Sequence, residues 1–260
     1  MNLNLTDKII LVTGGGRGIG EGIVRALAAE GAVPVIIGRD EADNRRVVAD
    51  AEAAGGRAAQ FVAELTQPAA CEQAVQAALA AFGRVDGLVN NAGVNDGVNL
   101  ANGNYEEFMA SLHRNLIHYY LMAHHALPAL KISRGSIVNI VSKTAETGQG
   151  GTSAYAAANG GRNALTREWA VELLPFSIRV NAVIVAECRT PMYDEWLNTL
   201  PDPEAKLRQI VSKIPFENRM TTTAEIAAMV VFLLSSQSSH TTGQLIHVDG
   251  GYVHLDRAIA

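Results

Sequence analysis

Short apolar runs alternate with Ala-, Glu- and Arg-rich stretches along the whole chain, and this alternation constrains the fold more than any other feature of the sequence. The runs are too short to be helices, and their near-continuous Val and Ile content is typical of strands covered on both faces. Repeated alternation of strand and helix predicts parallel strands joined by right-handed crossovers. We therefore predict one α/β domain over residues 1–260, with a doubly wound sheet of about seven strands and helices on both faces. The predicted strands are residues 9–12, 33–37, 58–63, 87–89, 137–141, 178–183 and 245–248, and the predicted helices are 20–30, 41–54, 69–82, 105–130, 153–174 and 223–234.

One long stretch, at about residues 187–215, interrupts this pattern. Pro191, Pro201 and Pro203 fall inside otherwise helical sequence there. Irregular stretches of this length in compact domains are usually lids or binding loops. We expect a substrate lid in this part of the chain.

Composition narrows the possible partners and compartment. The 260 residues are 48% hydrophobic, enough for one large core, and the formal net charge is −5. No cluster of Lys or Arg marks a groove for nucleic acid or a contact with an anionic membrane. The start of the chain is polar, and the longest apolar run, residues 226–234, is half the length of a membrane span. Two cysteines, Cys71 and Cys188, are too few for a disulfide framework, so we expect a soluble protein of the cytoplasm without nucleic-acid or membrane partners.

A glycine-rich turn, TGGGRGIG at residues 13–20, lies between the first predicted strand and the first predicted helix. Gly14, Gly18 and Gly20 let the backbone turn tightly and bring N–H groups and a helix N-terminus against a pyrophosphate. A glycine turn without a ligand is the alternative. The position of the turn favours a dinucleotide site, with Arg17 and Ile19 beside the phosphates.

The end of the second predicted strand indicates which dinucleotide is bound. NAD enzymes usually have a carboxylate there that accepts hydrogen bonds from the ribose hydroxyls and repels a 2′-phosphate. This chain has Gly38 instead, followed by Arg39, and Arg17 lies in the glycine turn. Two guanidinium groups could converge on a 2′-phosphate, so we predict NADP. NAD remains possible because Asp40 could serve a ribose.

The glycine turn, the segment NNAG at residues 90–93, and the ordered set Asn115, Ser142 and Tyr155 resemble the short-chain dehydrogenase/reductase family over essentially the whole chain. The resemblance implies a Rossmann-like fold, a nicotinamide cofactor and hydride transfer at an alcohol carbon. The family more often has Asp where Glu64 stands and Pro where Val185 stands. The cofactor contacts that the resemblance implies are Glu64, Leu65, Asn91, Ala92, Gly93, Tyr155, Asn159 and Thr190.

The resemblance also implies roles for the three ordered residues. Removal of hydride from an alcohol leaves a proton on oxygen, which Tyr155 as a phenolate would take. Ser142 would hydrogen-bond the same oxygen, and Asn115 would hold a water in the proton relay.

The main departure from the family is Asn159, which stands where the family has a lysine one helical turn after the tyrosine. That lysine binds the nicotinamide ribose, and its charge favours ionisation of the tyrosine. Asn159 keeps a possible ribose contact but brings no charge, so we expect Asn159→Lys to raise activity. Three interpretations stay open: a deliberately changed active enzyme, a natural enzyme with weak activity or a shifted pH optimum, and a nucleotide-binding protein without turnover. Lys143 is an unfavourable substitute, because neighbouring strand residues face opposite ways.

The segment from Ser142 to Tyr155 and the C-terminal residues resemble the L-fucose dehydrogenase group and related aldose dehydrogenases. This resemblance implies oxidation of a sugar at the anomeric carbon to a lactone. A sugar pocket needs convergent polar groups, and Glu146, Gln149 and Glu187 are the candidates beside Ser142 and Tyr155. A 3-oxoacyl or hydroxysteroid reductase of the same family is the alternative.

Two further expectations concern metals and assembly. Four histidines, His113, His118, His124 and His125, lie in one predicted helix, but none pairs with a third ligand at a recognisable spacing. We therefore predict no metal site. The family resemblance implies a homotetramer.

Overall fold

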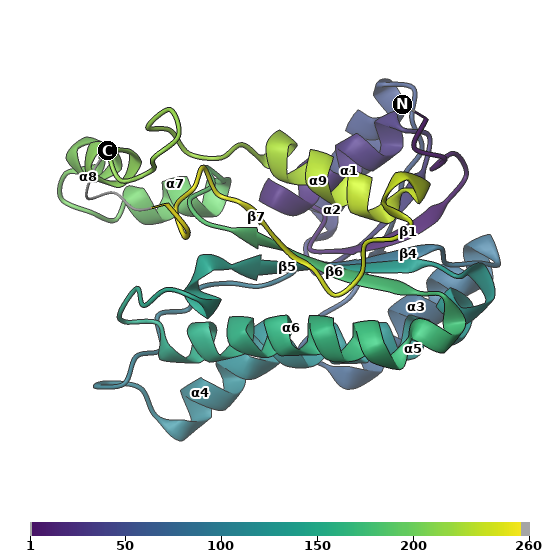
Figure 1. Ribbon diagram of the computed structural model, residues 1–260, viewed down its shortest axis with the longest axis horizontal. Helices are drawn as coiled ribbons and strands as arrows, with labels where there is room; N and C mark the ends of the chain where they lie inside the picture. Colours follow the sequence, from purple (N-terminus) through teal and green to yellow (C-terminus); the bar gives the residue numbers. More distant parts are fainter. Residues whose placement is uncertain (1, 256–260) are drawn as a thin grey trace.

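The computed structural model describes residues 2–255, which form a single α/β domain around a parallel sheet. Seven strands pair within these residues in the order β3-β2-β1-β4-β5-β6-β7, and every pair is parallel. Figure 1 shows helices on both faces, as the alternation of the sequence predicts. The strands are β1 (Ile9–Thr13), β2 (Val33–Gly38), β3 (Ala59–Val62), β4 (Gly87–Asn90), β5 (Ser136–Ser142), β6 (Arg179–Val185) and β7 (Leu245–Val248).

The helices form two layers. In Figure 1, α1 (Gly18–Ala29), α2 (Glu41–Ala53) and α9 (Thr223–Leu234) lie on one side of the sheet. The other side carries α3 (Pro68–Phe82), α4 (Tyr105–Leu112), α5 (His118–Ser133) and α6 (Ser153–Glu172). None of the helices within residues 2–255 combines the length and the apolar character needed to cross a bilayer.

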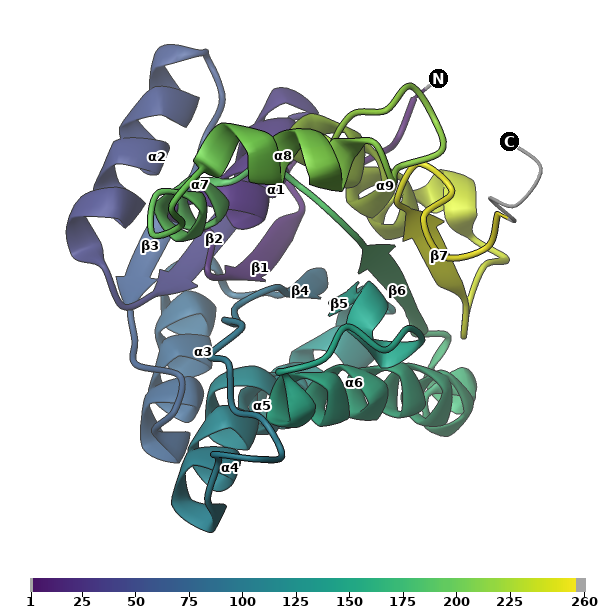
Figure 2. The same cartoon turned by 90° about the vertical axis from the view of Figure 1, so that its left-hand side faces the viewer.

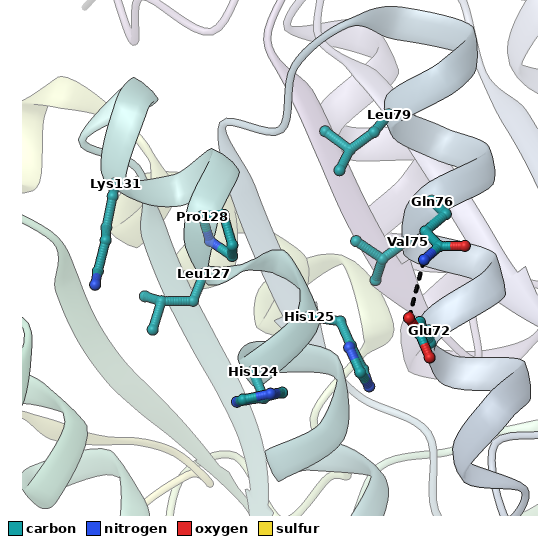
Figure 3. A pocket seen from close by; sticks show the side chains of 9 residues that line it. All are labelled: Glu72, Val75, Gln76, Leu79, His124, His125, Leu127, Pro128 and Lys131. Atoms are coloured by element: carbon teal, nitrogen blue, oxygen red, sulfur yellow. Dashed lines mark hydrogen bonds between the residues drawn. The ribbon is translucent and has the colours of Figure 1, made fainter.

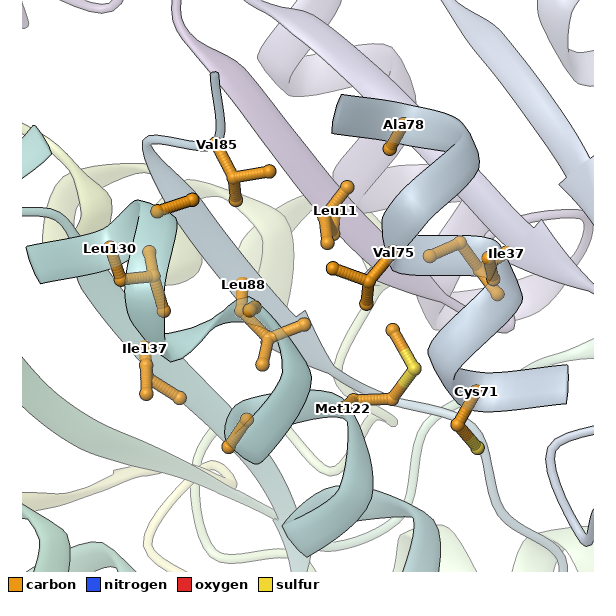
Figure 4. Close-up of a cluster of buried hydrophobic side chains, with 14 of the residues drawn as sticks. Leu11, Ile37, Cys71, Val75, Ala78, Val85, Leu88, Met122, Leu130 and Ile137 are labelled. Carbon is orange, nitrogen blue, oxygen red and sulfur yellow. The ribbon is translucent and has the colours of Figure 1, made fainter. Parts of the chain in front are cut away.

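Each layer encloses its own hydrophobic core. Figure 4 shows the core under α3 and α5, where Leu11 and Leu88 of the sheet pack with Val75 and Met122 of the helices. The second core joins α1 and α9 to the opposite face of the same strands. Because both faces are buried, the strands contain nearly continuous Val, Ile and Leu instead of alternating with polar residues.

The strand order reverses between β1 and β4. From β1 the chain proceeds outward through β2 and β3, then returns to the other side of β1 and continues from β4 to β7. Crossovers leave a crevice at the carboxyl ends of the strands where the order reverses, which is the usual ligand site of such sheets. The fold therefore places the segments that follow β1, β4 and β5 around one crevice.

The predicted helix at residues 105–130 is three segments. Between α4 and α5 lies a π-helical turn, His113–Ile117, which carries Asn115. A π-turn adds a residue within a helix, and such turns are frequent at functional sites. The apolar pattern of the sequence does not reveal it, because residues 105–130 read as helical without a break.

The predicted lid region contains two helices, α7 (Pro191–Leu197) and α8 (Pro203–Val211). Pro191 and Pro203 are the first residues of these helices, where a missing N–H costs no hydrogen bond. Thr190 and Asp202 cap them by accepting hydrogen bonds from Tyr193 N and Ala205 N. In Figure 2, viewed from the left-hand side of Figure 1, α7 and α8 cross in front of the sheet.

Candidate active site

The glycine turn after β1 has the backbone conformation that the sequence predicts. Gly14 and Gly18 have φ of 65° and 59°, a region that favours glycine. A Cβ at Gly20 would lie 2.1 Å from the carbonyl oxygen of Gly14. The chain is thus shaped so that the backbone N–H groups at the start of α1 stay open toward the crevice.

The segment after β4 is fastened to this turn. The hydroxyl oxygen of Thr13 accepts hydrogen bonds from Asn91 N and Ala92 N at 2.8 and 3.0 Å. The side-chain amide of Asn91 donates to Thr13 O at 2.9 Å. These bonds hold the two sides of the crevice at a fixed distance.

One cavity of about 530 Å³ occupies the crevice. This volume lies within the range of small-molecule and cofactor sites. The predicted cofactor and catalytic residues that line it are Gly14, Arg17, Gly18, Ile19, Arg39, Glu64, Leu65, Asn91, Ala92, Gly93, Ser142, Tyr155 and Thr190. An open glycine turn and a helix N-terminus at one end, with polar groups at the other, fit an extended dinucleotide.

A second hollow, of about 460 Å³, lies between α3 and α5. Figure 3 shows Val75 and Leu79 of α3 and Leu127 of α5 lining it, with His124 and His125 at one end. It contains no residue of the predicted catalytic or cofactor set. The chemistry of the sequence therefore belongs to the crevice and not to this hollow.

The cofactor-selecting end of the crevice lacks a free carboxylate on β2. The side-chain amide of Asn44 donates to Gly38 O at 3.0 Å, and a Cβ at Gly38 would lie 3.0 Å from Asn44 Oδ1. Asp40 caps α2 by accepting from Asp43 N at 2.9 Å. Arg39 is 74% exposed, and its nearest carboxylate, Glu64, is 3.7 Å away. A guanidinium held this loosely is available to a phosphate.

Glu64 is the carboxylate at the predicted adenine side. Its Oε1 accepts hydrogen bonds from Thr66 N and Thr66 Oγ1 at 3.1 and 2.9 Å. Burial opposes ionisation, but these bonds and the charge of Arg39 outweigh it and lower the pKa of Glu64. The adenine side of the crevice therefore carries a negative charge at neutral pH.

Ser142 and Tyr155 come together at the other end of the cavity. Ser142 is the last residue of β5, and Tyr155 lies in the first turn of α6. The hydroxyl oxygen of Ser142 accepts from Thr144 N at 3.2 Å, which leaves its proton free to donate to a substrate oxygen.

Asn115 and Asn159 do not line this cavity. Asn115 Oδ1 accepts from Val94 N at 2.8 Å, and its amide donates to Ser111 Oγ at 3.3 Å. Asn159 is fully buried, and its Oδ1 accepts from Ser142 N at 2.8 Å. Its amide donates to Tyr155 O at 2.8 Å. Asn159 therefore fastens the end of β5 to α6, and its predicted ribose contact would require these groups to turn elsewhere.

Arg162 lies at this site and is not among the residues predicted from the sequence. It is 3% exposed, and its Nε donates to the carbonyl oxygen of Asn115 at 2.6 Å. Its Nη1 donates to Ile140 O at 3.2 Å and to Asn159 Oδ1 at 3.1 Å. Its Nη2 is buried without a hydrogen-bond partner, and Arg162 lines the cavity. The signal that could have found it is its helical spacing, since residues i, i+4 and i+7 share one face and these are Tyr155, Asn159 and Arg162.

The predicted substrate residues outside the serine and tyrosine are engaged with the protein. Glu187 forms a buried ion pair with Lys143 and accepts a hydrogen bond from the hydroxyl of Tyr193 at 2.8 Å. Burial and the Glu187 charge raise the pKa of Tyr193, so its proton stays in that bond. Gln149 is exposed. Neither Glu187 nor Gln149 lines the cavity.

Glu146 also lies outside the cavity. It accepts from the amide of Asn163 at 3.2 Å and pairs with His247 Nε2 at 3.0 Å. Within residues 2–255, one group of three side chains could hold a metal ion, and it consists of Glu146, His247 and His254. The candidate ligand atoms of these residues all lie within 4.8 Å of one another. The four histidines considered in the sequence do not take part in it.

A parallel sheet with a glycine turn at its reversal point, and a serine and a tyrosine in the same crevice, define a dinucleotide-dependent oxidoreductase. A family profile described as "Enoyl-(Acyl carrier protein) reductase" matches residues 14–253. L-fucose dehydrogenase of Bos taurus is 35% identical over 252 residues, covering 96% of this chain and 91% of the relative. The chain belongs to the short-chain dehydrogenase/reductase family and is an NAD(P)-dependent oxidoreductase.

Two solved structures show how closely the fold is shared. The Cj0485 dehydrogenase superposes with a TM-score of 0.94 at 41% identity, covering 99% of this chain and 98% of the other. The ligand-free aldohexose dehydrogenase of Thermoplasma acidophilum superposes with a TM-score of 0.89 at 26% identity, with the same coverage.

Proposed function

We propose that the protein oxidises the anomeric hydroxyl of an aldose of the L-fucose type to a lactone, with NADP as the preferred cofactor. The observation that carries the oxidoreductase part is the single cavity in which the glycine turn, Ser142 and Tyr155 meet. Relatives named L-fucose dehydrogenase and aldohexose dehydrogenase support the sugar part.

The residues of the crevice have separate roles in binding the cofactor and in moving the proton. The cofactor, when bound, supplies the hydride acceptor. The N–H groups after β1 and the guanidinium groups of Arg17 and Arg39 would hold its phosphates. Tyr155, once ionised, takes the proton of the sugar hydroxyl, while Ser142 donates a hydrogen bond to the same oxygen and keeps it in place. Loss of a hydride from the same carbon, to the acceptor that the bound cofactor would supply, would leave a carbonyl at the former hydroxyl carbon.

The preference for NADP follows from charge at the ribose end. Gly38 presents no carboxylate there, and the carboxylate of Asp40 caps α2. Arg17 lies 3.7 Å from Glu195, as loosely paired as Arg39 is with Glu64. Exposed pairs at such distances contribute little stability, so both side chains are free to turn toward a phosphate.

Substrate oxidation tests the proposal directly. Purified protein is assayed for reduced-cofactor formation with NADP and NAD, using L-fucose and other aldoses, a 3-hydroxyacyl thioester and a hydroxysteroid. We expect aldoses of the L-fucose configuration to react fastest, with Tyr155→Phe as the inactive control. Turnover of the thioester or the steroid without any aldose would overturn the sugar assignment and favour the acyl or steroid alternative.

We also propose a cytoplasmic homotetramer. Large apolar side chains stay exposed along α5 and near the end of α6, with Ile132 at 88% and Val171 at 66% exposure. Apolar surface gathered on neighbouring helices is typical of contacts between subunits. Both cysteines are free thiols, which suits a reducing compartment.

A further inference from the structure

The crevice holds a buried positive charge that no carboxylate neutralises. Among the described residues that line it, Arg17, Arg39 and Arg114 each have a carboxylate partner, Glu195, Glu64 and Asp96 respectively. Arg162 has none within 4.0 Å. Buried charges are costly unless they are paired or used, so an unpaired guanidinium in the wall of the cavity that Tyr155 also lines indicates a functional role.

The surroundings of Arg162 orient its charge without neutralising it. Three of its N–H groups donate to neutral oxygens of Asn115, Ile140 and Asn159, and its guanidinium lies 4.2 Å from the ring centroid of Tyr119. Nη2, which carries the remaining two N–H groups, lies against Gly93, where an added Cβ would be 2.9 Å away. Gly93 belongs to the cavity wall, so this end of Arg162 is buried directly behind that wall.

We infer that Arg162 is a positioning residue of this site. It lies two helical turns after Tyr155 on α6 and supplies the positive charge that a lysine at position 159 supplies elsewhere in the family. The inference rests on Tyr155 as the proton acceptor of the proposed function. Arg162 stabilises the phenolate of Tyr155 electrostatically and acts through it, and it does not touch the reacting atoms.

The other charged groups around the crevice leave Arg162 as the source of that field. Burial and the charge of Arg162 lower the pKa of His118 to about 3, so His118 is neutral at working pH. The ammonium of Lys143 is paired with Glu187, and Arg114 with Asp96. From α7 Tyr193 faces the cavity as a neutral phenol, and from the segment after β3 Glu64 contributes a negative charge on the adenine side.

Asn159 belongs to the same arrangement. Its Oδ1 accepts from both Ser142 N and Arg162 Nη1, so it holds the guanidinium and the catalytic strand end together. A lysine at 159 would place an ammonium against a guanidinium, and like charges in contact are unfavourable in a buried site. We therefore expect Asn159→Lys alone to harm the enzyme, in contrast to the expectation drawn from the sequence.

The test exchanges the charge between the two positions. We compare Arg162→Gln, Arg162→Lys, Asn159→Lys and the double variant Asn159→Lys with Arg162→Gln. Loss of the Arg162 charge lowers the population of the Tyr155 phenolate at neutral pH, and the variants are designed to detect a loss of about a hundredfold. We expect Arg162→Gln to lower kcat by about that factor at pH 7, with KM changed less than about threefold, and to regain activity as pH rises. Arg162→Lys should keep kcat within about tenfold, and the double variant should exceed both Arg162→Gln and Asn159→Lys.

A second readout uses no substrate and no cofactor. Ionisation of Tyr155 is followed by the ultraviolet difference spectrum of tyrosinate, with Tyr155→Phe subtracting the signal of the other tyrosines. We expect Arg162→Gln to move this ionisation to higher pH and Arg162→Lys to leave it nearly in place. Circular dichroism melting and the NADP dissociation constant identify variants that do not fold.

Two outcomes would overturn the inference. One is an ionisation of Tyr155 that does not move in folded Arg162→Gln. The other is a kcat that falls by the same factor at every pH. Failure of the sugar proposal looks different, because the aldoses would then be unreactive while the tyrosinate titration still responds to Arg162.

Discussion

Three side chains on one face of α6 decide how this site differs from the lysine-bearing members of its family. Tyr155 lines the cavity, Asn159 ties it to β5, and Arg162 brings a buried charge to its back wall. Of the three interpretations of Asn159, a nucleotide-binding protein without turnover is the one that this arrangement disfavours.

Arg39 carries the prediction for cofactor choice. Arg39→Ala should weaken NADP binding by about 1.5–3 kcal/mol, the scale of a charge-assisted hydrogen bond, and leave NAD nearly unchanged. Calorimetric titration with both cofactors measures the two dissociation constants. Arg45→Ala, at an exposed arginine of α2 that pairs within its own helix, is the matched control. Equal losses for NADP and NAD would refute the preference.

His118 makes the stability of the protein sensitive to acid. Its Nδ1 is buried without a partner, and its folded-state pKa is about 3, against about 6.5 when unfolded. Between pH 6.5 and pH 3 the His118 side chain is protonated in the unfolded chain and neutral in the folded chain. The free energy of unfolding therefore decreases as pH falls from 6.5 toward 3. At pH 5 the loss relative to pH 8 from this group is about 2 kcal/mol. Urea unfolding of His118→Asn should show a shallower dependence on pH than the parent, whereas His124→Asn, on the exposed side of α5, should not.

The glycine turn is the element on which cofactor binding depends most sharply. Gly20→Ala places a Cβ 2.1 Å from Gly14 O, so the turn must shift and its N–H groups leave their positions. We expect the dissociation constants of NADP and NAD both to rise at least about thirtyfold, equivalent to about 2 kcal/mol. Gly148→Ala, where an added Cβ meets nothing within 4 Å, is the control and should bind both cofactors normally. Normal binding by Gly20→Ala would show that the turn is not the phosphate site.

Elements with a strong periodic pattern could be predicted from the sequence, and elements set by tertiary contacts could not. The seven strands could be predicted from short apolar runs, and in β1 and β2 these runs are Val- and Ile-rich because both faces are buried. The π-turn at Asn115 has no such signature, since it depends on hydrogen bonds to Val94 and Arg162 that arise only after folding. The prolines of the lid region suggest an irregular segment, because the sequence does not distinguish a proline that breaks a helix from one that begins a helix. Pro191 and Pro203 begin helices α7 and α8.

The candidate site shows the same division. Gly14, Ser142 and Tyr155 could be placed in one crevice because each follows a predicted strand or opens a predicted helix. The polar loop residues predicted to bind substrate were Glu146, Gln149 and Glu187. In the structure Glu187 pairs with Lys143, Glu146 pairs with His247, and neither carboxylate lines the cavity. Partners of this kind lie far apart in the sequence, so polarity in a loop does not predict which way a side chain faces.

At the scale of the whole molecule, the exposed apolar residues of α5 and α6 predict how copies assemble. Ile132→Glu combined with Val171→Glu should break the tetramer into smaller species in light scattering, because burying two carboxylates at a contact is costly. Leu100→Glu is the control, since Leu100 is 91% exposed on the loop after β4 and belongs to neither helix. A parent protein that is already monomeric at micromolar concentration would contradict the proposed assembly.

The bond between Asn159 and Arg162 also bears on how such a site is reached in evolution. An ammonium at 159 and a guanidinium at 162 repel each other, and removing both leaves Tyr155 without a nearby cation. A lineage that changes from one arrangement to the other by single substitutions therefore passes through an intermediate of low fitness. The exception is a lineage in which the arginine appears at a time when its charge is tolerated.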